Sequence, residues 1–316
     1  MILNQERVFL ALGLCRIKRL QFYMKTLAQQ KKRTGLFFIS PTVLILILVV
    51  LIPLIFSFII SFFNYTLVDP SFKQFILFQN FSTVFQDIYL WNALRVTLVF
   101  VFTVVPLEFV IGFFIAVLLN RNIRFKGLFY TILTIPMVMS PVAVGLIWKM
   151  FLHADLGIVN YVFSVLHLPS VNWLGSNKIA LFTIIMIDIW HQISFMILIL
   201  LAGLKSLPKE PFESAKIDGA NNVQSFFYIT LGLMRPVISV AILIRIIFSF
   251  KTYDLVYIMT RGGPGISTEL ISYFIYKKTF MGMDFSQATA ISYALLLLIM
   301  VIVIILFREM SGKKWD

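Results

Sequence analysis

The sequence is poor in charge, cysteine and histidine, and each shortage excludes a class of protein. Only 13% of the 316 residues are charged, whereas soluble domains carry about 25%. The single cysteine, Cys15, excludes an intrachain disulfide and a cage of thiolate metal ligands. The three histidines, His153, His167 and His191, match no zinc-ligand spacing. A soluble protein stabilised by disulfides or structural zinc is therefore excluded.

The motifs of catalysis are absent as well. The chain holds no Gly-x-x-x-x-Gly-Lys-Ser/Thr loop for a nucleotide phosphate, no serine nucleophile elbow and no His-Glu-x-x-His. The glycine-rich stretch "RGGPG" at 261–265 lacks the lysine that a phosphate loop requires. We therefore expect no catalytic residue, no bound cofactor and no metal in this chain.

Long apolar segments dominate what is present. Hydrophobic residues make up 60% of the chain, and about 20 apolar residues suffice to cross a bilayer. The pattern predicts an all-α, polytopic membrane protein with six transmembrane helices, at about 36–63, 93–119, 128–151, 179–203, 236–258 and 287–307. Pro136 and Pro141 are expected to kink the third helix, because each removes a backbone hydrogen bond.

The net charge of +13 is explained by membrane topology rather than by nucleic acid. If residues 1–35 are cytoplasmic, the inner segments hold 18 Lys and Arg residues and the outer segments hold six. Positive charge accumulates on the cytoplasmic side of membrane proteins, so both termini are predicted to be cytoplasmic. Residues 1–35 form a basic cytoplasmic N-terminal segment, and its first 23 residues are either a dispensable extension ahead of Met24 or an interfacial amphipathic helix. An extracytoplasmic loop follows at 64–92 and a cytoplasmic tail at 308–316.

One inner loop, 204–235, is unusually polar and contains "LPKEPFESAKIDGANNVQSFFYITLG" at 207–232. Prolines precede acidic residues that favour a helix start, and Gly219 permits a sharp turn without a Cβ clash. We expect a short helix, a turn and a second helix on the cytoplasmic side. Such a projection is suited to docking in a groove of a soluble partner.

The spacing in this loop resembles the Glu-Ala-Ala loop of permeases from binding-protein-dependent ABC importers. The match runs from Glu213, Ser214 and Ala215 through Asp218, Gly219 and Ala220 to Ile229 and Leu231. Ser214 replaces an alanine of the family pattern, and Gly232 replaces a proline. Blocks at 119–152, 201–220 and 250–280 are similar to the carbohydrate branch of the same family.

The resemblance implies a MetI-like core of five helices at 93–307, with the first helix added in front. It also implies a permease subunit of a bacterial or archaeal cytoplasmic (inner) membrane importer, carrying a sugar or related polyol. Its partners would be a cytoplasmic ABC ATPase dimer, which binds the ATP and Mg, a second and different permease, and an extracytoplasmic solute-binding protein. Glu213 and Asp218 would contact the ATPase, Gly219 would form the turn, and Ala215 and Ala220 would pack closely.

Several polar residues fall inside the predicted spans, where ionisable groups are costly and usually face a partner or a cavity. Glu108 and Arg245 are mid-span, so they either pair with each other or contact the solute. Asp188, His191 and Gln192 lie within about one helical turn, so they line a translocation path or serve packing.

Two other functions remain open from the residues. An ion-gradient-driven secondary transporter could use Glu108, Asp188 and His191 as a proton relay. An ABC permease for phosphate, amino acids or peptides would carry the same inner loop.

Overall fold

The computed structural model describes residues 37–69, 74–121 and 124–311, and the predictions made for residues 1–35 lie outside it. The chain divides into two compact units between Ile59 and Ile60. The described part of the first unit, residues 37–59, is all but the last residue of the apolar helix Phe37–Ile60. This helix contains a π turn, η1 (Ile47–Leu51), and ends in α2 (Ile52–Ile60). Its length and composition suit a membrane span.

The second unit is built from helices, and no strand occurs in the described parts of either unit. In order they are α3 (Gln79–Gln86), α4 (Ile88–Asn120), α5 (Lys126–Val138), α6 (Pro141–Phe151), α7 (Ile158–Val165), α8 (Ala180–Ser206), α9 (Glu210–Ile217), α10 (Asn222–Gln224), η2 (Ser225–Thr230), α11 (Leu231–Phe250), α12 (Asp254–Met259), α13 (Ile271–Tyr276), η3 (Lys277–Met281) and α14 (Phe285–Ser311). The predicted all-α class is confirmed.

Five segments of the described chain are long and apolar enough to cross a membrane, and a sixth span exists if α5 and α6 count as one. The five are Phe37–Ile60, Ile88–Asn120, Ala180–Ser206, Asn222–Met259 and Phe285–Arg308. The axes of α5 and α6 differ by 96°. The third predicted span is therefore two helices rather than one kinked helix.

The break between α5 and α6 has a local cause at Pro141. This proline is the first residue of α6, and Ser140 before it is extended, with φ −62° and ψ 135°. A residue that precedes proline is driven out of the helical region by the proline ring. Pro136, in contrast, stays inside α5, which continues to Val138. The break therefore lies at Pro141, one of the two prolines at which a kink was predicted, whereas Pro136 falls in the last turns of a continuous helix.

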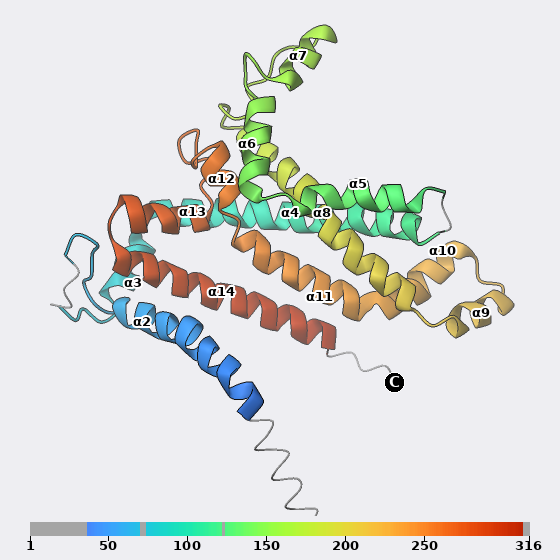
Figure 1. Ribbon diagram of the computed structural model, residues 1–316, viewed down its shortest axis with the longest axis horizontal. Helices are drawn as coiled ribbons and strands as arrows, with labels where there is room; N and C mark the ends of the chain where they lie inside the picture. Colours follow the sequence, from blue (N-terminus) through green and yellow to red (C-terminus); the bar gives the residue numbers. More distant parts are fainter. Residues whose placement is uncertain (1–36, 70–73, 122–123, 312–316) are drawn as a thin grey trace, which may run out of the picture. The chain divides into compact units, whose positions relative to one another are not determined.

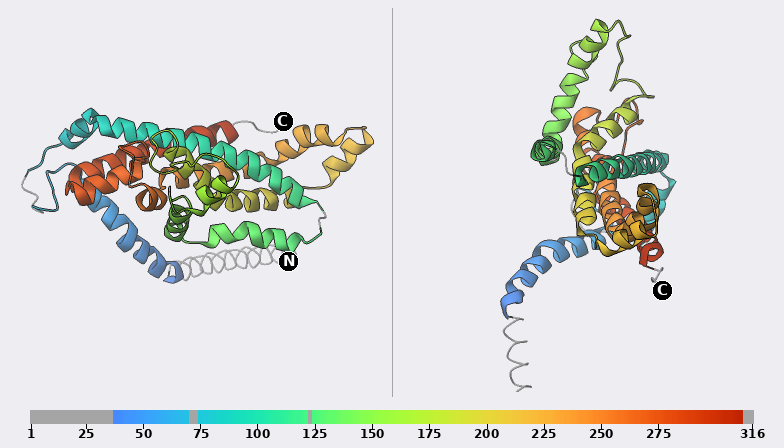
Figure 2. Two further views of the ribbon diagram at one scale, coloured as in Figure 1. Left: turned by 90° about the horizontal axis from the view of Figure 1, so that it is seen from above. Right: turned by 90° about the vertical axis from the view of Figure 1, so that its right-hand side faces the viewer.

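Helices α4 and α8 form the centre of the second unit, and α11 and α14 lie alongside (Figures 1 and 2). Glycines allow the central helices to approach. A Cβ on Gly112 of α4 would lie 3.0 Å from Met196 Cγ of α8, and one on Gly203 of α8 would lie 2.7 Å from Val237 Cγ1 of α11. Small residues commonly permit such approaches in membranes. Polar side chains on α4, α8 and α11 can therefore meet.

The connection between α6 and α8 is ordered by one amide side chain. Asn160 of α7 donates to the carbonyls of Ala154 at 2.7 Å and Val171 at 2.9 Å. Its carbonyl oxygen accepts from the Val171 backbone at 3.2 Å and from Trp173 Nε1 at 3.0 Å. All hydrogen-bonding groups of this buried amide are thereby used. The loop is a defined structure projecting beyond α6 (Figure 1).

Candidate functional site

Three charged side chains meet in the core of the helical bundle. Glu108 of α4, Asp188 of α8 and Arg245 of α11 are 0%, 3% and 2% exposed. Arg245 Nε and Nη2 donate to the two carboxylate oxygens of Glu108, the second at 2.9 Å. Arg245 Nη2 also donates to Asp188 Oδ2. One guanidinium therefore neutralises carboxylates from two other helices.

The predicted pairing of Glu108 with Arg245 is confirmed, and Asp188 is a third member that the sequence did not place there. The bidentate fork between guanidinium and carboxylate is the strongest geometry available to such a pair. A buried ion that lost its partner would be very costly in this environment. The charged triad thus fixes the mutual register of α4, α8 and α11.

One turn along α8, His191 is held between Gln192 and the break in the third span. Its Nδ1 lies 3.0 Å from Gln192 Nε2, and its Nε2 lies 3.1 Å from the carbonyl oxygen of Met139. The amide nitrogen of Gln192 can only donate, and the carbonyl oxygen of Met139 can only accept. The ring is therefore neutral, protonated at Nε2. His191 satisfies a carbonyl that the break between α5 and α6 leaves without a helical partner.

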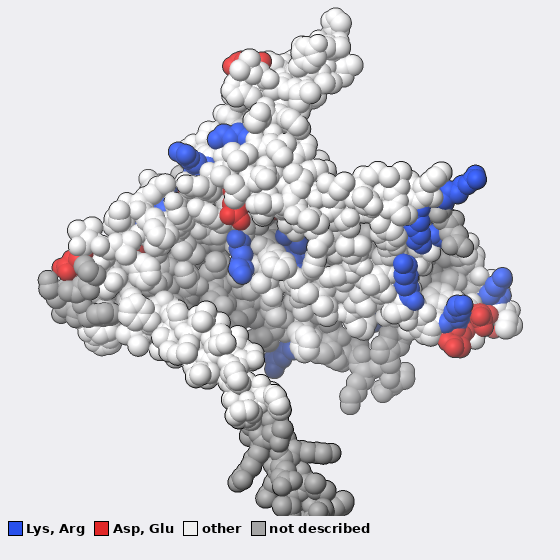
Figure 3. Space-filling view, in the orientation of Figure 1, with Lys and Arg blue, Asp and Glu red and all other residues white. Residues whose placement is uncertain are grey.

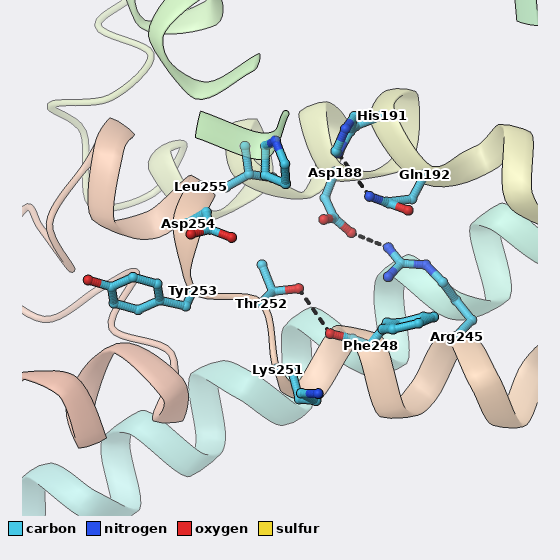
Figure 4. Close-up of a pocket in the computed structure, with 11 residues that line it drawn as sticks. Asp188, His191, Gln192, Arg245, Phe248, Lys251, Thr252, Tyr253, Asp254 and Leu255 are labelled. Atoms are coloured by element: carbon cyan, nitrogen blue, oxygen red, sulfur yellow. Dashed lines mark hydrogen bonds and ion pairs between the residues drawn. The ribbon is translucent and has the colours of Figure 1, made fainter. Parts of the chain in front are cut away.

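These groups border a cavity of about 250 Å³ (Figure 4). Its lining comes from the start of α6, the middle of α8, the end of α11 and the start of α12. The lining residues are Pro141, Asp188, His191, Gln192, Arg245, Phe248, Lys251, Thr252, Tyr253, Asp254 and Leu255. Four of the five residues named as a possible translocation path thus share one cavity. The fifth, Glu108, contacts Arg245 but does not line it.

An aromatic cluster that the sequence reading overlooked adjoins this cavity. Tyr253, a lining residue, packs against Tyr257 at 5.4 Å, Tyr273 at 6.3 Å and Tyr276 at 5.1 Å between ring centroids. Burial, and then the neighbouring carboxylate of Glu269, raise the pKa of Tyr273 above its ordinary value, so its phenol is uncharged at neutral pH. The sequence did contain a signal for this cluster. Tyr253 and Tyr257 are four positions apart, and Tyr273 and Tyr276 are three apart, so the members of each pair lie on the same face of a helix.

The inner loop forms the predicted helix, turn and second helix. Helix α9 ends at Ile217, and Gly219 has φ +80°, a conformation that glycine adopts without strain. Asn221 and Gln224 then make a capping box, with hydrogen bonds of 2.8 and 2.9 Å, that starts the second helix. The π turn η2 joins this start to α11, so the helix continues through Gly232 without a break.

The residues predicted to contact an ATPase are distributed over this projection. Glu213, Ser214, Asp218 and Gly219 are exposed, whereas Ala215, Ala220, Ile229 and Leu231 are half-buried. Figure 3 shows that charged side chains gather at the end of the second unit that carries α9. Apolar side chains are exposed beside them, with Ile217 at 86% and Tyr228 at 81%. An exposed surface of mixed charge and apolar groups is typical of an interface.

Nothing in the described residues supplies a metal centre, because no three of their His, Cys, Asp and Glu side chains are close enough to share an ion. The polar groups of the cavity are suited to hydrogen bonding, and its aromatic groups to contact with the apolar face of a small solute.

Comparison with known proteins identifies the family. Residues 108–315, more than half of the chain, match the family described as "Binding-protein-dependent transport system inner membrane component". The chain belongs to this family. As a permease it is a multi-pass membrane protein and a transporter subunit, and the predicted MetI-like fold is confirmed.

Relatives of this permease share most of its length. It is 38% identical over 261 residues to a probable ABC transporter permease protein, y4oQ, of Sinorhizobium fredii, covering 82% of this chain and 84% of the relative. It is 32% identical over 266 residues to the trehalose/maltose transport system permease protein MalF of Thermococcus litoralis, covering 84% and 90%. A solved bacterial alginate ABC transporter, in complex with its alginate pentasaccharide-bound periplasmic protein, contains a chain of 25% identity with a TM-score of 0.76, covering 88% and 94%.

Proposed function

We propose that this permease forms the translocation path of an ATP-driven importer for a sugar or related polyol. The observation that carries the proposal is the cavity between α6, α8, α11 and α12, where hydrogen-bonding side chains face the aromatic groups Phe248 and Tyr253. Saccharides present hydroxyl groups on their edges and apolar C–H groups on their faces, and this lining matches both. The similarity to a trehalose/maltose permease supports the same solute class.

The partners proposed are those of the family. A cytoplasmic ATPase dimer, which binds ATP and Mg, docks on the projection around α9 and Gly219. A second, different permease completes the path, and an extracytoplasmic solute-binding protein delivers the solute. Both termini are proposed to lie in the cytoplasm of a bacterial or archaeal cell. The complex solved for the alginate transporter supports the assignment of the binding protein.

Substitution at Gly219 tests the coupling to the ATPase. A Cβ at this position would meet no atom of this chain within 4 Å, so within the chain a substitution acts through the positive φ. Gly219→Val should abolish co-purification with the ATPase and ATP-dependent uptake, because β-branched residues do not adopt this conformation. Gly219→Asn, which tolerates it, should retain both. Equal activity of the two variants would refute the assignment of this turn.

A charge reversal at Glu213 provides a second test in the same element. Glu213→Lys should impair ATPase association, whereas Glu210→Lys, also exposed on α9 but outside the family spacing, should have little effect. Uptake that survives ATP depletion and collapses with an uncoupler would instead favour the ion-gradient transporter. The buried triad of Glu108, Asp188 and Arg245 is the observation that keeps this second function in consideration. Uptake of phosphate, an amino acid or a peptide alone would favour the related non-sugar permease.

A further inference from the structure

The buried end of the cavity offers no uncompensated positive charge. Arg245 is matched by two carboxylates, so the triad has a net charge of −1 if both are ionised and zero if one is protonated. His191 is neutral by its hydrogen bonds. The remaining charges of the lining, Lys251 and Asp254, are exposed and of opposite sign. The lining as a whole is therefore not cationic in any of these protonation states.

The same groups retain unused hydrogen-bonding capacity. The guanidinium of Arg245 has five N–H groups, and its Nη1 has no hydrogen-bond partner among the described residues. In Figure 4 this second terminal nitrogen points away from Asp188 toward the open part of the cavity. Asp188 Oδ1 and Gln192 Oε1 are also without a partner in the described parts of the chain. One donor group and two acceptors are thus available to a ligand.

We propose that this cavity selects an uncharged polyhydroxy solute and discriminates against its anionic derivatives. Asp188 and Arg245 are the specificity-determining pair, with Asp188 Oδ1 accepting from one hydroxyl group and Arg245 Nη1 donating to another. The proposal rests on the proposed function, because it assigns a solute class to the same translocation path.

Anions are disfavoured for a physical reason. An anion that leaves water needs a compensating cation in the site. Of the two cations in the lining, Arg245 is already paired twice, and Lys251 is exposed to solvent and offset by Asp254 in the same lining. A neutral hydroxyl group needs only a hydrogen-bond partner, which Nη1 and Oδ1 supply. Phe248 and Tyr253 add surfaces for the apolar face of the solute.

The test compares matched neutral and anionic probes on the complete transport complex, purified in nanodiscs without the solute-binding protein, whose own selectivity would mask that of the cavity. The pairs are trehalose with trehalose 6-phosphate and glycerol with sn-glycerol 3-phosphate, with maltose as an additional neutral probe. We expect at least one neutral probe to bind, at least tenfold more tightly than its phosphate. Equal or tighter binding of the phosphate, or binding of no neutral probe, would overturn the proposal.

Two substitutions that each remove one negative charge distinguish the contribution of Asp188 to the discrimination from that of Glu108. Asp188→Asn should reduce the discrimination against the phosphate about tenfold, because the triad then loses its excess of carboxylates beside the ligand. Glu108→Gln, which removes an equal charge from a residue outside the lining, should reduce it less. The reverse order would contradict the assignment of Asp188. If either variant fails to assemble, Lys251→Glu at the exposed rim of the lining remains. It adds negative charge to the cavity, so the discrimination against the phosphate should increase, and an unchanged or smaller discrimination would contradict the proposal.

Uptake into proteoliposomes with the solute-binding protein present distinguishes the two proposals. ATP-dependent uptake of an anionic sugar would overturn the neutral selectivity while leaving the import function intact. Absence of ATP-dependent uptake of every saccharide would overturn both.

Discussion

At the scale of single residues, Arg245 links three helices of the bundle. Its guanidinium holds carboxylates of α4 and α8 at once, and all three side chains are almost completely buried. Such a network contributes less by attraction than by the penalty for losing one member. Removing the cation should therefore be far more damaging than removing all three charges.

Arg245→Met should lower the free energy of unfolding by about 3–5 kcal/mol, because it leaves two buried carboxylates without a cation. The triple variant Arg245→Met, Glu108→Gln, Asp188→Asn should recover at least half of this loss, since no unpaired charge remains. Thermal unfolding of the detergent-solubilised protein, followed by fluorescence, measures both. If the triple variant were as unstable as the single one, charge imbalance would not be the cause.

Asn160 is a second residue with a defined local role. Asn160→Ala leaves the Ala154 and Val171 carbonyls and the Trp173 indole without their partner. We expect a loss of about 1–3 kcal/mol, confined to the loop between α6 and α8. Hydrogen exchange of peptides covering 154–173 should accelerate. Asn172→Ala is the control, because its exposed side chain accepts one hydrogen bond, from Gly175, and should change exchange much less.

At the scale of elements, Gly112 lets α4 approach α8 closely, and Gly203 does the same for α8 and α11. Gly203→Ala should destabilise the protein by roughly 1–3 kcal/mol, because its Cβ would lie 2.7 Å from Val237 Cγ1 and force α8 and α11 apart. Gly127→Ala in α5 is the matched control, since its Cβ would meet no atom within 4 Å. The control should be neutral or stabilising by up to about 1 kcal/mol, because alanine favours helix. Equal melting temperatures of the two variants would argue against a tight contact at Gly203.

The elements also show where sequence reasoning succeeds and where it stops. Apolar runs predict helices because a bilayer requires each span to satisfy its own backbone, and the all-α class was correct. Of the six predicted spans, five are single helices in the described chain and the third is the broken pair α5 and α6. Kinks were expected at both Pro136 and Pro141, but the break occurs before Pro141, where Nε2–H of His191 on another helix donates to the freed Met139 carbonyl. Periodicity along one segment contains no information about such a tertiary contact.

Only one pair of the candidate site could be predicted, because its other contacts also join residues of different helices. A mid-span ionisable residue indicates a partner, and only Glu108 and Arg245 were isolated enough in the sequence for the pairing to be deduced. Asp188 was grouped with His191 and Gln192, its polar neighbours in the chain, so its contact with Arg245 was not predicted. The spacing of residues in the inner loop correctly predicted its helix, turn and second helix. Its contact with an ATPase stays a prediction.

At the scale of the whole molecule, the distribution of positive charge predicts which loops face the cytoplasm. The single natural cysteine simplifies the test, since Cys15→Ser gives a background without thiols. In that background Asn172→Cys should react with an impermeant maleimide added to intact cells. Ser214→Cys, on α9, should react only in inside-out vesicles. The opposite pattern would reverse the proposed topology.

The charged triad has a consequence for how the protein is made. Glu108 and Arg245 are 137 positions apart in the chain, and ribosomes add about 5–20 residues per second. The carboxylate of α4 therefore waits roughly 7–27 s at these rates before its cation is synthesised. During that interval Glu108 of α4 lacks the cation that neutralises it in the folded bundle. Maturation of this permease should therefore be limited by the arrival of α11 rather than by insertion of the earlier helices.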